Sequence, residues 1–167
     1  MSAIIKAIRT ILRIGTGTSF LVLIGAVVVQ VAGRSFIGSS AVWTEELTRF
    51  ALLYLAGFGT GLALFTGDLV NVDLISEALP GKLPWLLRLI SAMIILVFCL
   101  LLIVPAWRFT SIGALQTSPA MAASMIYIHA SVLLLLTALG IVAILRIVGM
   151  LTGSTGGKPE QLIGGSE

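Results

Sequence analysis

Three ionisable side chains, Glu45, Glu46 and Arg49, lie within five consecutive residues. Arg49 follows Glu45 by four positions and Glu46 by three, so on a helix it lies one turn from both carboxylates and can pair with either. Thr44 can cap such a helix, acidic residues suit its positive end, and Trp43 can anchor at a membrane–water interface. Two interpretations stay open: a well-capped helix start at a membrane surface, or a site where a carboxylate faces a partner or a cavity.

One arginine satisfies only part of two carboxylates, so we expect one carboxylate to take a donor from elsewhere. Within this chain the candidates are Arg34 and Arg108, and the other source is a second protein. We therefore predict that Glu46 or Arg49 contributes to assembly rather than to ion binding. The candidate subunit-contact or structural residues are Trp43, Glu45, Glu46, Arg49, Gly57, Gly61 and Arg108.

Gly57, Gly59 and Gly61 follow in the same uncharged stretch, and Gly57 with Gly61 forms a GxxxG pattern. Such glycines let two membrane helices approach closely. A phosphate-binding glycine loop is the alternative, but no strand precedes these glycines and they lie at membrane depth. The pattern therefore favours helix packing over ligand binding.

The sequence lacks the groups that most chemistry needs. It has one histidine, His129, and one cysteine, Cys99, so a site with two histidine ligands and an intrachain disulfide are both excluded. No nucleophile–base–acid arrangement appears, and no apolar stretch has an acidic residue near its middle. We predict no catalytic residue, no cofactor and no metal site, and we expect the chain to work with a partner.

The elements that carry these residues are predicted from composition. Of 167 residues, 58% are hydrophobic and 10% charged, whereas a soluble domain carries roughly 25% charged residues. About 20 helical residues cross the roughly 30 Å hydrocarbon layer, and four apolar stretches are long enough, at 14–33, 47–67, 89–107 and 125–145. The second passes Arg49 and is uncharged from Phe50 to Gly67, and the other three carry no charge. The sequence predicts an all-α integral membrane protein with four transmembrane helices, forming a single domain over 1–150. Strands are disfavoured because the stretches do not alternate apolar and polar residues.

The connection between the second and third spans carries its own pattern. Over 71–79, Val72, Ile75 and Leu79 share one helical face while Asp73 and Glu77 lie on another. This spacing predicts a short amphipathic helix on the cytoplasmic membrane surface, with a polar loop as the alternative. The Gly/Ser-rich end, 151–167, is predicted to be a flexible cytoplasmic tail.

The basic residues predict the orientation of the chain. With the N-terminus in the cytoplasm, seven basic residues lie inside and three outside, which favours both ends inside under the positive-inside rule. The net charge of +3 comes with few charges in total, so it indicates orientation rather than nucleic-acid binding. The inside set is Lys6, Arg9, Arg13, Lys82, Arg88, Arg146 and Lys158, and the outside set is Arg34, Arg49 and Arg108.

Several of these segments, taken together, resemble the DctQ-type small membrane subunit of tripartite ATP-independent periplasmic (TRAP) transporters. The resemblance covers most of 34–127, and length and four-span layout agree with it. The matching segments are Arg34-Ser35-Phe36, Trp43-Thr44-Glu45-Glu46-Leu47-Thr48-Arg49, Gly57-Phe58-Gly59-Thr60-Gly61, Val72-Asp73-Leu74-Ile75 with Leu79-Pro80, and Thr117-Ser118-Pro119 with Tyr127.

The resemblance implies a three-part importer in the bacterial inner membrane. A periplasmic binding protein would capture an organic acid or similar solute, and a large membrane subunit would move it by an elevator-like motion coupled to an ion gradient. The small subunit would brace the large one and help dock the binding protein. The alternatives are a self-contained homo-oligomeric transporter or channel, and a membrane enzyme or haem subunit, which the lone His129 disfavours.

Overall fold

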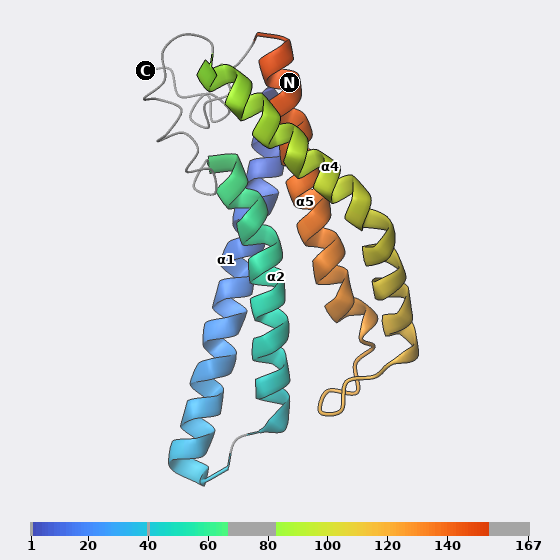
Figure 1. The fold of residues 1–167 in the computed structure, drawn as a ribbon. Helices are drawn as coiled ribbons and strands as arrows, with labels where there is room; N and C mark the ends of the chain where they lie inside the picture. Colours follow the sequence, from blue (N-terminus) through green and yellow to red (C-terminus); the bar gives the residue numbers. More distant parts are fainter. Residues whose placement is uncertain (1, 40, 67–82, 154–167) are drawn as a thin grey trace.

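The computed structural model describes residues 2–39, 41–66 and 83–153, and its regular elements there are helices (Figure 1). Helix α1 spans Ser2–Ala32 and runs into a π-helical turn, Gly33–Ile37. Helix α2 spans Val42–Thr66, and helix α4 spans Leu83–Ile112 before a 3₁₀ turn. Helix α5 spans Ile126–Leu151.

The four helices confirm the predicted all-α architecture, because each is long and apolar enough to cross a membrane. All four are longer than the uncharged stretches that predicted them, α1 beginning twelve positions before residue 14. Lysine and arginine are good helix formers, so Lys6, Arg9 and Arg13 end the hydrocarbon span without ending the helix. The predicted amphipathic helix over 71–79 lies outside the described residues, and so do residues 154–167 of the tail predicted over 151–167.

The helices form two antiparallel pairs, α1 with α2 and α4 with α5, and contacts between α2 and α5 join the pairs (Figure 1). The order across the bundle is therefore α1, α2, α5, α4. The start of α1 lies at the same end as the end of α5, as an even number of crossings requires. The loop between α1 and α2 and the loop between α4 and α5 lie at the opposite end.

Small residues set the spacing between α2 and its neighbours. A methyl group built on Gly61 would lie 2.8 Å from the Ala138 Cβ of α5 and 3.2 Å from Leu12 Cδ2 of α1. One built on Gly57 would lie 3.3 Å from the Ser131 carbonyl oxygen of α5. Within this chain, both glycines of the GxxxG pattern therefore allow α2 to approach α5 closely. The core beside them consists of Leu12, Leu64, Phe65, Ala138 and Val142.

Candidate functional site

The start of α2 differs from the predicted cap. The helix begins at Val42, so Thr44 lies inside its first turn instead of preceding it. The Thr44 hydroxyl donates to the Ala41 carbonyl oxygen at 2.6 Å and the side chain is fully buried. A capping side chain accepts a hydrogen bond from a backbone N–H, whereas Thr44 donates one. The expected cap was wrong because the helix begins at Val42, three residues before the start that a Thr44 cap would give.

Glu46 is bound by the loop between α4 and α5. Its Oε2 accepts hydrogen bonds from the Ser118 hydroxyl and from the Met121 N–H at 3.1 Å, and its Oε1 accepts one from the Ala120 N–H at 3.2 Å. All three groups donate, as an ionised carboxylate requires. Arg49 adds an electrostatic attraction to Glu46 from one turn along the helix. We call this arrangement of Glu46, Ser118, Ala120 and Met121 the Glu46 clamp.

The loop folds back on itself so that its N–H groups face α2. Thr117 and Ser124 form an isolated antiparallel bridge, and the Ser118 N–H donates to the Ala123 carbonyl at 2.8 Å. The Ala122 N–H donates to the Ser118 carbonyl at 3.0 Å, and Ala122 adopts a left-handed backbone with φ of 51°. Ser118, 2% exposed, is the buried centre of this loop. The loop thus presents two backbone amides and one hydroxyl to the Glu46 carboxylate.

We expected one of the two carboxylates to take a hydrogen-bond donor from elsewhere, and Glu46 does so in the Glu46 clamp. The predicted sources were Arg34 or Arg108 of this chain, or a second protein, and neither arginine is among the groups that donate to Glu46. Both arginines are exposed. Sequence reasoning missed the three loop donors because two are backbone N–H groups, which carry no side-chain signal. Ser118 stands in a segment that carries the family resemblance, but its partner is 72 positions away.

The other ionisable residues of the motif point outward. Glu45 and Arg49 are exposed, and Trp43 is 43% exposed. Within the described part of the chain, no hydrogen bond or ion pair holds the Glu45 carboxylate. The two neighbouring carboxylates therefore differ, since Glu46 joins the two helix pairs and Glu45 is open to the surroundings of the protein.

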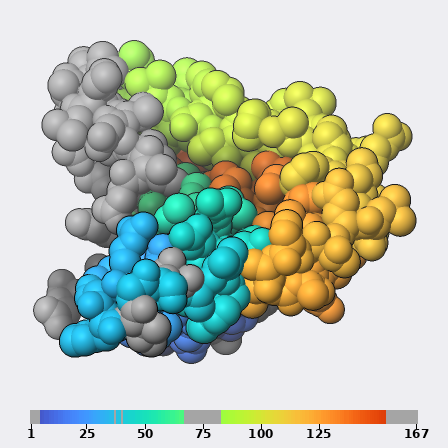
Figure 2. Space-filling model, turned by 90° about the horizontal axis from the view of Figure 1, so that it is seen from below, coloured from blue at the N-terminus to red at the C-terminus, as the bar shows by residue number. Residues whose placement is uncertain are grey.

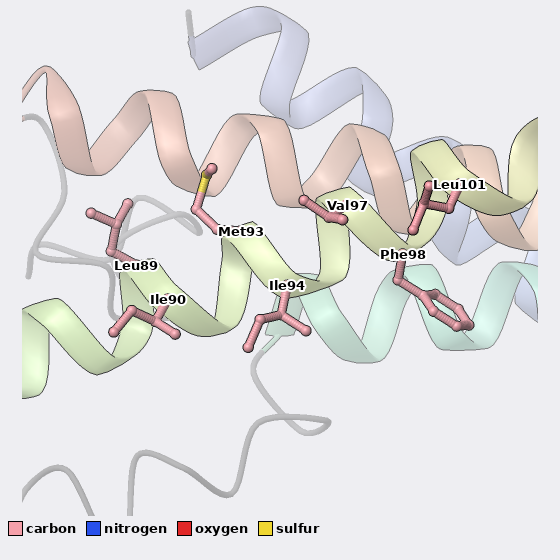
Figure 3. Close-up of a pocket in the computed structure, with 7 residues that line it drawn as sticks. All are labelled: Leu89, Ile90, Met93, Ile94, Val97, Phe98 and Leu101. Atoms are coloured by element: carbon pink, nitrogen blue, oxygen red, sulfur yellow. The ribbon is translucent and has the colours of Figure 1, made fainter.

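The outer face of α4 is apolar, in contrast to the charged start of α2. Figure 3 shows seven apolar side chains between Leu89 and Leu101, all from α4, lining a shallow pocket of about 480 Å³. No polar side chain lines this pocket. An exposed helix face of this composition suits contact with lipid acyl chains.

Comparison with known proteins decides the family. The sequence pattern described as "Tripartite ATP-independent periplasmic transporters, DctQ component" matches residues 23–153, well over half of the chain. The chain belongs to the DctQ family. The predicted resemblance is thereby confirmed, and the protein is a transporter component with a multi-pass arrangement in the inner membrane.

Two sialic acid TRAP transporter proteins are similar to parts of this DctQ chain. The permease protein SiaT of Haemophilus influenzae is 27% identical over 67 residues, which are 40% of this chain and 11% of SiaT. The small permease protein SiaQ of Vibrio cholerae is 29% identical over 77 residues, which are 46% of this chain and 44% of SiaQ. The chain thus matches less than half the length of either relative.

Two further contacts tie the helices of this DctQ protein near the clamp. The Tyr54 hydroxyl of α2 donates to the Tyr127 carbonyl of α5. The His129 ring of α5 stacks on Phe109 of α4 at a centroid distance of 4.0 Å, and its Nδ1 lies 3.1 Å from the Phe109 carbonyl oxygen. That carbonyl lies in the last turn of α4. His129 therefore joins α5 to the end of α4.

The opposite end of this DctQ bundle buries two basic residues that sequence analysis treated only as orientation signals. Arg88 of α4 is 4% exposed and Arg146 of α5 is 2% exposed, and both make interactions. Charged side chains are almost never buried to this extent without partners. Among the described residues, no group of three His, Cys, Asp or Glu side chains is placed to hold a metal ion.

Proposed function

We propose that this chain is the small membrane subunit of a TRAP-type secondary importer. In this proposal it braces a large membrane transport subunit and helps dock a periplasmic solute-binding protein, for ion-gradient-driven symport of an organic acid or similar solute. The observation that carries the proposal is the DctQ match over residues 23–153. The SiaT match adds to it, because there a DctQ-like stretch forms part of a much longer permease chain.

The described structure suits a brace. Ser118, Ala120 and Met121 hold Glu46, and Gly61 brings α2 against α5, so the two helix pairs are joined at two levels. A subunit that holds the large subunit in place during solute transport benefits from contacts that join its own helices. Solute recognition is then assigned to the partner subunits.

Purified alone in liposomes, the chain is expected to take up no solute under a sodium gradient. Co-reconstitution with its large subunit and binding protein is expected to produce uptake, because the transport path is assigned to the large subunit. Radiolabelled C4-dicarboxylates and sialic acid are suitable first solutes, and loss of uptake after collapsing the gradient is the control. Gradient-driven uptake by this chain alone would favour the homo-oligomeric transporter and reject the brace.

We also propose that both ends of the chain lie in the cytoplasm. The basis is the excess of seven basic residues over three on the predicted inner side. Reporter fusions after Ser39 and Gln116 are expected to read periplasmic, while fusions after Lys82 and at the C-terminus are expected to read cytoplasmic. Paired alkaline phosphatase and fluorescent-protein fusions at each site provide matched readouts. A periplasmic reading at Lys82 would contradict this topology.

A further inference from the structure

We propose that one face of α2 is the surface against which a transmembrane helix of the large subunit packs. This open face consists of Glu45, Arg49, Leu52, Leu53 and Ala56, all of them exposed. In this arrangement Glu45 and Arg49 pair with polar or charged groups of the partner helix. The inference rests on the proposed function and names the face that would carry out the bracing.

The other sides of α2 are occupied by this chain. Phe58 packs over Gly15 of α1, while Gly57 and Gly61 face α5. Glu46 also points toward the α4–α5 pair, since the loop between those helices binds it. The open face repeats at spacings of three, four and seven residues, so its members form one stripe on the remaining side. Figure 2 shows a hollow between α2 and α4, with α5 at its floor.

The charges on the open face indicate protein rather than lipid as its neighbour. An ionisable group near hydrocarbon is costly unless it has a partner, and the described residues supply none for the Glu45 carboxylate. The α4 outer face, in contrast, has only apolar lining between Leu89 and Leu101 (Figure 3). Of these two exposed surfaces, the α4 face fits acyl chains and the α2 face requires complementary polar groups.

The residues that follow along α2 favour a helix as the partner. Ala56 is exposed, and Thr60 and Ala63 continue the same side of the helix as half-buried residues. The Thr60 hydroxyl donates to the Ala56 carbonyl at 2.6 Å, so it is satisfied within α2. Small residues allow close approach of helices in membranes, and polar side chains at their ends fix register. Two charged residues of opposite sign, followed by small residues, combine both features.

The test uses charge swaps on a tagged small subunit co-expressed with its large subunit. Glu45→Arg and Arg49→Glu are each expected to reduce the co-purified large subunit by about tenfold or more, roughly the effect of 1.4 kcal/mol. The double variant, Glu45→Arg with Arg49→Glu, keeps one acidic and one basic residue at these two positions of α2 but presents reversed charges to the partner. We expect it to stay as defective as the single variants. Full recovery would show that only the balance of charge within α2 matters and would overturn the inference.

A bulky substitution gives an independent test without changing charge. Ala56→Trp on the open face is expected to lower co-purification by a similar factor, whereas Val97→Trp on the α4 outer face is the matched control and is expected to have no effect. Size-exclusion profiles of the isolated variants confirm that each still folds. Equal recovery of the large subunit with Ala56→Trp, or loss with Val97→Trp alone, would overturn the choice of face while leaving the proposed function intact. Failure of the unmodified chain to co-purify with the large subunit would instead reject the proposed function.

Discussion

Gly61→Ala is expected to separate α2 from α5 and destabilise the protein. The added methyl group would lie 2.8 Å from the Ala138 Cβ, which is attached directly to the backbone and cannot rotate away. Overpacking of this kind costs about 1–3 kcal/mol, and the better helix propensity of alanine recovers at most about 1 kcal/mol. Gly61→Val, with two more methyl groups, is expected to do more damage. The measurement is the thermal unfolding midpoint of the purified chain in detergent.

Two variants control this prediction. Gly59→Ala lies in the same helix, but its added methyl group would be 4.0 Å from Thr16 Cγ2, an ordinary contact, so its midpoint is expected to stay equal or rise. Ala138→Gly combined with Gly61→Ala moves the methyl group from α5 to α2 and is expected to recover much of the loss. An unchanged midpoint for Gly61→Ala would contradict the packing seen between α2 and α5.

Glu46→Ala is expected to release the loop between α4 and α5. The carboxylate is the acceptor for the Ser118 hydroxyl and for the N–H groups of Ala120 and Met121, so its removal breaks three hydrogen bonds, although the Met121 N–H keeps the Ser118 Oγ as a second acceptor. Amide hydrogen exchange across 116–125 is expected to accelerate on the order of tenfold or more, because local opening becomes easier. Glu46→Gln is expected to have a smaller effect, since one of its terminal atoms still accepts. Hydrogen-exchange mass spectrometry of the loop peptide measures both.

The adjacent carboxylate is the matched control for the clamp. Glu45→Ala removes a carboxylate of the same helix turn that has no bond to the loop, so exchange across 116–125 is expected to stay unchanged. Ser118→Ala removes one donor, and combined with Glu46→Ala it is expected to add little, because both act on the same contact. Additive effects of the two substitutions, or equal effects of Glu45→Ala and Glu46→Ala, would contradict the clamp.

The Glu46 variants and the variants of Glu45 and Arg49 also test two different roles, which the sequence motif alone does not distinguish. Glu46 is expected to matter for the internal stability of the small subunit, whereas Glu45 and Arg49 are expected to matter for assembly with the large subunit. Arg49→Gln is therefore expected to lower co-purification of the large subunit while leaving exchange across 116–125 nearly unchanged. Altered ion dependence of transport with intact assembly would instead point to a direct part of Arg49 in coupling.

The sequence by itself determined the fold class, the number of spans and the family. The thickness of the hydrocarbon layer sets the length of a membrane-spanning helix, so apolar stretches of that length can be recognised in the sequence without any tertiary information. The ends of the helices were harder to predict, because basic residues such as Lys6 and Arg13 mark the end of the apolar span although the helix extends past them. The ordered motifs between Arg34 and Tyr127 were enough for the resemblance that the DctQ match later confirmed.

Only the tertiary structure decided which carboxylate is bound and which is open. Glu45 and Glu46 are neighbours of one residue type, and they differ because successive helical residues point about 100° apart. That rotation aims Glu46 at a loop 72 positions away and leaves Glu45 on the outside. The donors at Ala120 and Met121 are backbone groups, whose direction depends on loop conformation rather than residue type. Which face of α2 meets α1, which meets α5 and which stays open was therefore decided by packing.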